Sequence, residues 1–310
     1  MRTKDLKGGG SHTQTFQEEH CSPSLVGGLQ QESVSLSAVH ILLSVTAFLG
    51  NSLILVALRK ESSLHPPSKL LYHSLAITDL LVGIVSEPLY VTYWIFLVQE
   101  NWSLCQYASN AAYIASYALC GVSLMTMTAI SVDRLLALLL GLRYRQIVTL
   151  KRTYIIRAVI WVMSTVAATC FKLDHRITHW SVYISIPFCL GITIISYTKI
   201  FRTLNRNQAQ VEGRFQQQPG QLNALNIARY KKAVYSALSV QLALVICYAP
   251  YSMMVVVIAD SKTHSSHLVV IWKLAVVLVY FNSTLNPFLY CWKISEVRQA
   301  VKQTIRDVLC

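Results

Sequence analysis

The stretch FNSTLNPFLY occupies residues 281–290 and follows an apolar run, HLVVIWKLAVVLVY, at 267–280. Pro287 has no backbone N–H and its ring clashes with the carbonyl four residues earlier, which costs roughly 3 kcal/mol inside a helix. Asn282 and Asn286 add polar amides to the same apolar segment. Such a segment is stable in a membrane when nearby polar groups satisfy the freed backbone and the amides. The stretch therefore predicts a buried helix with a hinge at Pro287.

The composition of the whole chain favours a membrane protein. Of its 310 residues 54% are hydrophobic and 13% are charged, with a mean hydropathy of +0.44, whereas soluble domains carry about 25% charged residues. Seven runs are long and apolar enough to cross a bilayer as helices, near 37–58, 70–97, 107–140, 154–173, 180–201, 233–259 and 267–291. We predict an all-α membrane protein with a seven-transmembrane helix bundle at 36–292. A disordered extracellular tail at 1–35 precedes it, and a cytoplasmic amphipathic helix at 293–310 follows.

The basic residues indicate which way the chain crosses the membrane. With the N-terminus outside, 20 of the 27 Lys and Arg residues fall on the inner side of the spans. Basic loops face the cytoplasm, so we predict an extracellular N-terminus and a cytoplasmic C-terminus. The net charge of +13 then belongs to a face that meets anionic membrane lipid, and nucleic acid is not expected as a partner.

Polar residues and short motifs recur in the spans in a characteristic order. In chain order they are Asn51, Asp79 in LAITD, Asp133-Arg134, Trp161, CYAP at 247–250 and NPFLY at 286–290. Together they resemble the rhodopsin-like (class A) G-protein-coupled receptors, near the melanocortin and adenosine receptors. The resemblance implies a plasma-membrane receptor that binds an extracellular ligand and activates a heterotrimeric G protein. It leans toward the stimulatory class, which raises cyclic AMP.

The resemblance also implies a sodium ion in the middle of the bundle, as an allosteric modulator. The matching residues are Asp79, Ser123, Asn282 and Asn286. A hard cation takes oxygen ligands, and its charge offsets the cost of burying a carboxylate. The alternative is a hydrogen-bonded polar cluster in which Asp79 is protonated. No other cofactor is expected.

A switch for G-protein coupling is the next implication of the resemblance. The matching residues are Asp133, Arg134, Tyr197, Pro250, Asn286, Pro287 and Tyr290. Leu135, Tyr248 and Cys189 replace residues that are usual in the family, and Tyr230 stands where an acidic partner of Arg134 is common. Because Arg134 lacks that partner, we predict raised basal signalling.

The residues that define ligand classes in related receptors are absent. Ser116 replaces the acid of the amine receptors, and Tyr280 replaces the retinal lysine of the opsins. Glu87 is an acid in an apolar span and therefore a candidate contact for a cationic ligand group, unless it simply pairs with Lys273. The expected ligand contacts are Glu87, Ser116, Tyr248, Tyr251, Lys273 and Tyr280.

Three covalent features are predicted. A disulfide between Cys105 and Cys170 would replace the usual bridge of the family, provided that their Cα atoms lie within about 7 Å. Asn101 begins a glycosylation sequon, Asn-Trp-Ser, in an outer loop. Cys310 is a candidate palmitoylation site, because prenylation needs three further residues after the cysteine.

Other function classes remain as alternatives. The sequence contains no nucleophile–base pair or phosphate loop that would indicate an enzyme, so no catalytic residues are expected. A transporter would require paired broken helices or internal symmetry, which the sequence does not display. A receptor-like scaffold that binds partners without signalling is left open by the departures at Leu135, Tyr248 and Cys189.

Overall fold

The computed structural model describes residues 21, 23–60, 64–170, 175–215, 242–257, 266–293 and 295–309. Every regular element in these ranges is a helix, which confirms the predicted fold class, a seven-helix bundle with a C-terminal helix. The helices are α2 (Pro23–Lys60), α3 (Pro66–Leu81), η1 (Val82–Ser86), α4 (Glu87–Val98), α5 (Trp102–Leu140), η2 (Gly141–Arg143), α6 (Tyr144–Ile147), α7 (Leu150–Thr169), α8 (His175–Phe215), α10 (Ser266–Lys293) and α11 (Ser295–Leu309). A further helix, Leu242–Val257, precedes α10.

Length and hydropathy identify the membrane spans among the described residues. Four stretches are long and apolar enough to cross a bilayer, namely Ser33–Lys60, Pro66–Val98, Trp102–Ile147 and Trp180–Arg206. The helix Leu242–Val257 is apolar but shorter. The second of the four stretches comprises α3, η1 and α4, which follow one another without a break.

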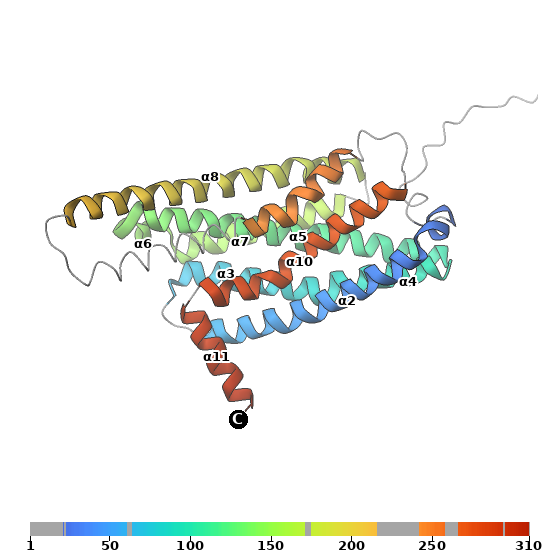
Figure 1. The fold of residues 1–310 in the computed structure, drawn as a ribbon, viewed down its shortest axis with the longest axis horizontal. Helices are drawn as coiled ribbons and strands as arrows, with labels where there is room; N and C mark the ends of the chain where they lie inside the picture. The colour runs from blue at the N-terminus through green and yellow to red at the C-terminus, as the bar shows by residue number, and fades with distance from the viewer. Residues whose placement is uncertain are drawn as a thin grey trace, which may run out of the picture.

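The helices lie along the long axis of the molecule, and α8 extends beyond the others at one end (Figure 1). The central helix is α5, which packs against α3, α4, α7 and α8. On the other side of the bundle, α2 packs against α3, α4 and α10. Helix α11 turns away from α10 and contacts α2 (Figure 1). We refer to the two ends of the bundle by residues of α5, as the Cys105 end and the Arg134 end.

Helix α2 begins earlier than the sequence suggested. Residues 23–35 were predicted to belong to a disordered tail, but they form the first turns of a helix that starts at Pro23. Ser33 and Leu36 are already buried in the bundle. The chain immediately before the helix is fixed by a disulfide at Cys21, which explains the order of a segment that is not apolar enough to be anchored by lipid alone.

The disulfide itself differs from the prediction. Cys105 is bonded to Cys21, and their Cα atoms are 6.1 Å apart. Cys170 is a free cysteine, so the predicted Cys105–Cys170 bridge is wrong. Both bonded cysteines are buried, and the bond ties the segment before α2 to the first turn of α5.

The second span changes its winding at η1, a π-helix of five residues. Pro88 follows it and cannot donate to the carbonyl of Ile84 four residues earlier, and a wider turn accommodates this loss. The Gly83 carbonyl accepts a hydrogen bond from Ser44 of α2, at 2.6 Å. A Cβ atom on Gly83 would lie 3.0 Å from the Ser44 carbonyl oxygen, so the close approach of α2 requires glycine here.

Helix α10 continues through Pro287, and the structure explains how. The proline leaves the carbonyl of Ser283, four residues earlier, without its helical donor. The Asn51 amide of α2 donates to that carbonyl at 3.1 Å. Gly50 makes room for the proline ring, because a Cβ atom there would lie 2.9 Å from Pro287 Cγ. The predicted satisfaction of the hinge by a nearby polar side chain is confirmed.

Candidate functional site

A buried carboxylate joins three helices in the middle of the bundle. Asp79 of α3 is fully buried and accepts three side-chain hydrogen bonds. Ser123 of α5 donates to Oδ1 at 3.0 Å, and Ser283 of α10 donates to the same oxygen at 2.8 Å. Asn286 donates to Oδ2 at 2.6 Å. Asp79 thus holds α3, α5 and α10 together.

The predicted sodium ligands are only partly arranged as expected. Ser123 and Asn286 contact Asp79, whereas the Asn282 amide donates to the sulfur of Met127 at 3.4 Å. Ser283 also contacts Asp79, which the sequence did not predict. The side-chain oxygens of Asn282 and Asn286 are buried and accept no hydrogen bond from the described residues. Unused oxygen acceptors beside a carboxylate are the donor set that a hard cation takes, so these residues fit a sodium ion.

A second polar cluster lies at the Arg134 end. Tyr144 of α6 donates to Asp133 Oδ1 at 2.6 Å, and Ser68 of α3 donates to Oδ2 at 2.9 Å. The guanidinium of Arg134 is farther away, with Nη2 3.8 Å from Asp133 Oδ2. The central guanidinium carbon, Cζ of Arg134, lies 5.4 Å from the ring centroid of Tyr72. Asp133 therefore directs its hydrogen bonds to α3 and α6 and makes only a long ion-pair contact with Arg134.

The other predicted switch residues occupy two places. Tyr197 is buried in the core, and Pro250 lies half-buried in the helix Leu242–Val257. Asn286 and Pro287 are buried on α10. Tyr230, Cys310 and the side chain of Tyr290 lie outside the described residues.

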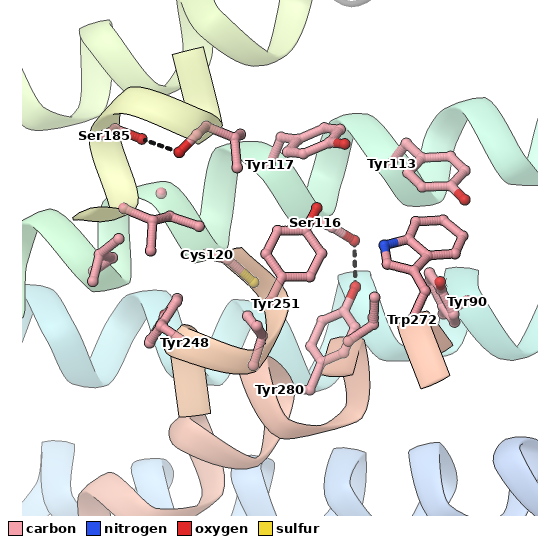
Figure 2. A pocket seen from close by; sticks show the side chains of 16 residues that line it. Tyr90, Tyr113, Ser116, Tyr117, Cys120, Ser185, Tyr248, Tyr251, Trp272 and Tyr280 are labelled. Atoms are coloured by element: carbon pink, nitrogen blue, oxygen red, sulfur yellow. Dashed lines mark hydrogen bonds between the residues drawn. The ribbon is translucent and has the colours of Figure 1, made fainter. Parts of the chain in front are cut away.

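An aromatic cavity of about 90 Å³ lies between five helices, α4, α5, α8, Leu242–Val257 and α10 (Figure 2). Four of the six predicted ligand contacts line it, namely Ser116, Tyr248, Tyr251 and Tyr280. The remaining lining residues are Tyr90, Tyr113, Tyr117, Cys120, Gly121, Leu124, Val182, Ser185, Ile186, Trp272, Val276 and Val279.

The other two predicted contacts, Glu87 and Lys273, do not line the cavity and do not pair with each other. Glu87 Oε2 lies 2.5 Å from Nδ1 of His40 in α2, and both side chains are buried. The Lys273 ammonium lies 3.7 Å from the ring centroid of Trp94. The Glu87–Lys273 pair, left open as an alternative, does not form, because the Glu87 carboxylate faces α2 and contacts His40 there.

The His40–Glu87 pair lies behind the cavity wall. The His40 ring packs against Tyr90, at 4.9 Å between centroids, and edge-on against Tyr280, at 5.3 Å. Both tyrosines line the cavity. His40 could have been identified from the sequence, because an ionisable residue within an apolar span is a functional-site candidate, as Glu87 is.

A chain of hydroxyl groups forms one edge of the cavity. The Tyr280 hydroxyl is hydrogen-bonded to Ser116 of α5 (Figure 2) and lies 2.9 Å from the Ser86 hydroxyl. Ser86 and Ser116 are 3.0 Å apart. Ser86, Tyr90 and Trp272 belong to the site but carry no motif that would have identified them, since serines and aromatic residues occur throughout the spans.

The helix order, the buried Asp79 and the Asp133-Arg134 pair are the features of one receptor class. Residues 50–175 and 172–290 match the family model described as 7 transmembrane receptor (rhodopsin family). The chain belongs to this family and is a G-protein-coupled receptor, a multi-pass protein of the plasma membrane.

Three similar curated proteins are receptors. The chain is 24% identical to the human adenosine receptor A2a over 87% of its length and 71% of the relative. It is 25% identical to human melanocortin receptor 5, over 86% and 83% of the two chains. It is 27% identical to the histamine H2 receptor of Canis lupus familiaris, over 88% and 80%. The relatives have names that refer to chemically different ligands, so the similarity defines the class of receptor and leaves the ligand open.

Proposed function

We propose that this receptor binds an extracellular ligand in the aromatic cavity and activates a heterotrimeric G protein at the Arg134 end. One observation carries the proposal. Helix α10 lines the cavity with Tyr280 and contacts Asp79 with Ser283 and Asn286, within two turns of the same helix. A ligand that moves Tyr280 therefore acts on the helix that also holds the central carboxylate.

The proposed orientation follows from charge. Of the 27 basic residues in the sequence, 20 fall on the inner side of the spans when the N-terminus is placed outside. The disulfide-bonded Cys105 end then faces the oxidising exterior, where disulfides persist. In this orientation the basic loops face the G protein and anionic lipid.

A sodium ion is proposed as an allosteric modulator at the central cluster. Asp79, Ser123, Asn282 and Asn286 would hold it, with Ser283 as an additional oxygen. A bound cation would supply the positive charge that a fully buried carboxylate lacks among these neutral partners. The alternative, a protonated Asp79, predicts that changing the sodium concentration leaves ligand affinity unchanged.

Raised basal signalling is proposed from the environment of Arg134. Its acidic neighbour Asp133 is engaged by Tyr144 and Ser68, and the position common for an acid on the sixth helix is Tyr230. Arg134 then contacts Asp133 only at 3.8 Å and lies against the Tyr72 ring, without an acidic partner on the sixth helix. The stimulatory, cyclic-AMP-raising G protein is the proposed partner, on the resemblance to melanocortin and adenosine receptors.

The decisive experiment is nucleotide exchange with the purified receptor in lipid nanodiscs and purified heterotrimeric G proteins. We expect ligand-free receptor to accelerate exchange above empty nanodiscs, and Arg134→Ala to abolish the acceleration. Arg306→Ala, which removes one exposed basic side chain from α11, is the matched control and should retain it. Exchange equal to empty nanodiscs would contradict basal signalling. If no G protein responds even with a binding ligand present, the non-signalling scaffold is the better interpretation.

Two modifications complete the proposal. Asn101 is exposed and caps α5, with its side-chain oxygen accepting from the Leu104 amide at 3.4 Å, which leaves the side-chain nitrogen for a glycan. Cys310 follows the amphipathic helix α11 and would carry a palmitoyl group that fixes this helix to the membrane surface. Mass spectrometry of the receptor from eukaryotic cells, before and after glycosidase and hydroxylamine treatment, tests both modifications.

A further inference from the structure

The walls of the aromatic cavity carry no formal charge. Of the sixteen residues that line it, seven are aromatic, and the polar ones are neutral serine, cysteine and tyrosine side chains. A charged group that leaves water for such a site loses its hydration without gaining an ionic partner, which is far more costly than burying a neutral polar group. The described lining therefore disfavours a charged ligand.

The ionisable groups near the cavity contact other residues. Glu87 is paired with His40 at 2.5 Å, and Asp79 accepts three hydrogen bonds. Lys273 follows the lining residue Trp272 directly in α10, and its Nζ lies against Trp94. None of these three groups lines the cavity, and contact with tyrosine faces only partly replaces the hydration of a cation.

The ring arrangement and the hydroxyl groups of the cavity define which uncharged ligands fit. The Tyr113 ring is nearly parallel to Trp272, at 6.2 Å and 12°, and to Tyr117, at 6.3 Å and 26°, so the three rings share one orientation in which a flat ring can stack. Beside these rings, the Ser116 and Tyr280 hydroxyls (Figure 2) can each donate or accept a hydrogen bond. We propose, resting on the proposed role of this cavity as the ligand site, that the ligand is an uncharged flat-ring compound with a hydrogen-bonding group directed at Ser116 and Tyr280.

Three probes that share one ring test the charge of the ligand. These are 3-(2-hydroxyethyl)indole, 3-(2-aminoethyl)indole and indole-3-acetate, which are neutral, cationic and anionic at neutral pH. Binding to the purified full-length receptor in nanodiscs is measured by saturation-transfer NMR titration. We expect the neutral probe to bind at least about tenfold more tightly than either charged one, a difference of about 1.4 kcal/mol. Equal or tighter binding of a charged probe, or no binding of the neutral probe in the millimolar range, overturns the proposal.

A matched pair of variants tests the location. Ser116→Asp adds a carboxylate to the cavity wall, whereas Ser116→Asn adds a side chain of the same shape without charge. We expect Ser116→Asp to reverse the order, so that the aminoethyl probe binds at least about tenfold more tightly than the hydroxyethyl probe. Ser116→Asn should keep the wild-type order. Ser185→Asp, on α8, serves if Ser116→Asp does not fold. An unchanged order in the folded Asp variant overturns the assignment to this cavity.

Nucleotide exchange on the same preparations separates this proposal from the proposed function. A receptor with Arg134-dependent exchange that prefers a charged probe contradicts the ligand class alone. A receptor with the expected probe order but no exchange contradicts G-protein activation alone.

Discussion

Replacing only one residue of the His40–Glu87 pair is expected to destabilise the receptor more than replacing both residues. The two groups are 2.5 Å apart and buried. If both are charged, their attraction is about 6–7 kcal/mol at an effective dielectric constant of about 20. Burying them costs several kcal/mol per ion, so the pair as a whole contributes little net stability. Removing one partner leaves the other buried alone, which costs about 3–5 kcal/mol.

Three variants measure this asymmetry. Glu87→Met and His40→Leu each leave one polar group unpartnered, whereas the double variant replaces the pair by apolar side chains of similar size. We expect each single variant to lower the melting temperature by roughly 6–15 °C, taking about 2–3 °C per kcal/mol for a chain of this size. The double variant should lie within a few degrees of wild type, because Oε1 of Glu87 has no hydrogen-bond partner among the described residues and is removed as well.

The assay is thermal melting of the purified receptor in one detergent, followed by intrinsic fluorescence. Thr92→Val is the control, because the Thr92 hydroxyl donates only within its own helix, to the Pro88 carbonyl at 2.8 Å. Its melting temperature should change by less than about 2 °C. Energetic coupling between His40 and Glu87 is refuted if the single variants melt like the control, or if the double variant loses the sum of the two single losses.

Two further outcomes are expected. Gly50→Val should cost about 1–3 kcal/mol, because its Cβ would lie 2.9 Å from Pro287, and melting curves should show this loss. Gly191→Ala meets nothing within 4 Å inside α8 and should melt at or slightly above the wild-type temperature. Cys21→Ser should cost about 2–4 kcal/mol, since the bond closes a loop with a sequence separation of 84. Peptide mapping without reductant should recover Cys21 linked to Cys105, and recovery of Cys105 with any other cysteine would contradict the structure.

Much of the fold was accessible from the sequence because membrane spans are specified locally. Each apolar run satisfies its own backbone as a helix, so hydropathy alone identifies the spans. The order of the motifs indicated how the helices are arranged. Asp79 contacts Ser123 and Asn286, as the resemblance implied. The hinge at Pro287 could also be anticipated, because a proline inside an apolar span requires a nearby polar partner, which is Asn51.

Pairings between distant segments were not accessible in the same way. Cys21 was assigned to a tail, so its bond to Cys105 was missed. A pair with Lys273 was one of two alternatives for Glu87, which contacts His40 instead. The π-turn at η1 directly precedes Glu87 and rotates the residues after it by roughly 100° relative to a regular α-helix, which the sequence did not reveal.

The same geometry connects the cavity to the centre of the bundle. Tyr280 is bonded to Ser116 and Ser86 above the hinge, and Ser283 and its carbonyl are held by Asp79 and Asn51 just before Pro287. In the proposed mechanism, a ligand that takes the hydrogen bond of Ser116 releases Tyr280, while the lower attachment of α10 persists. Both attachments precede Pro287, and the turn from Ser283 to Pro287 lacks one backbone bond. Release of Tyr280 is therefore expected to let the part of α10 before Ser283 move, while the contact of Ser283 with Asn51 of α2 stays intact.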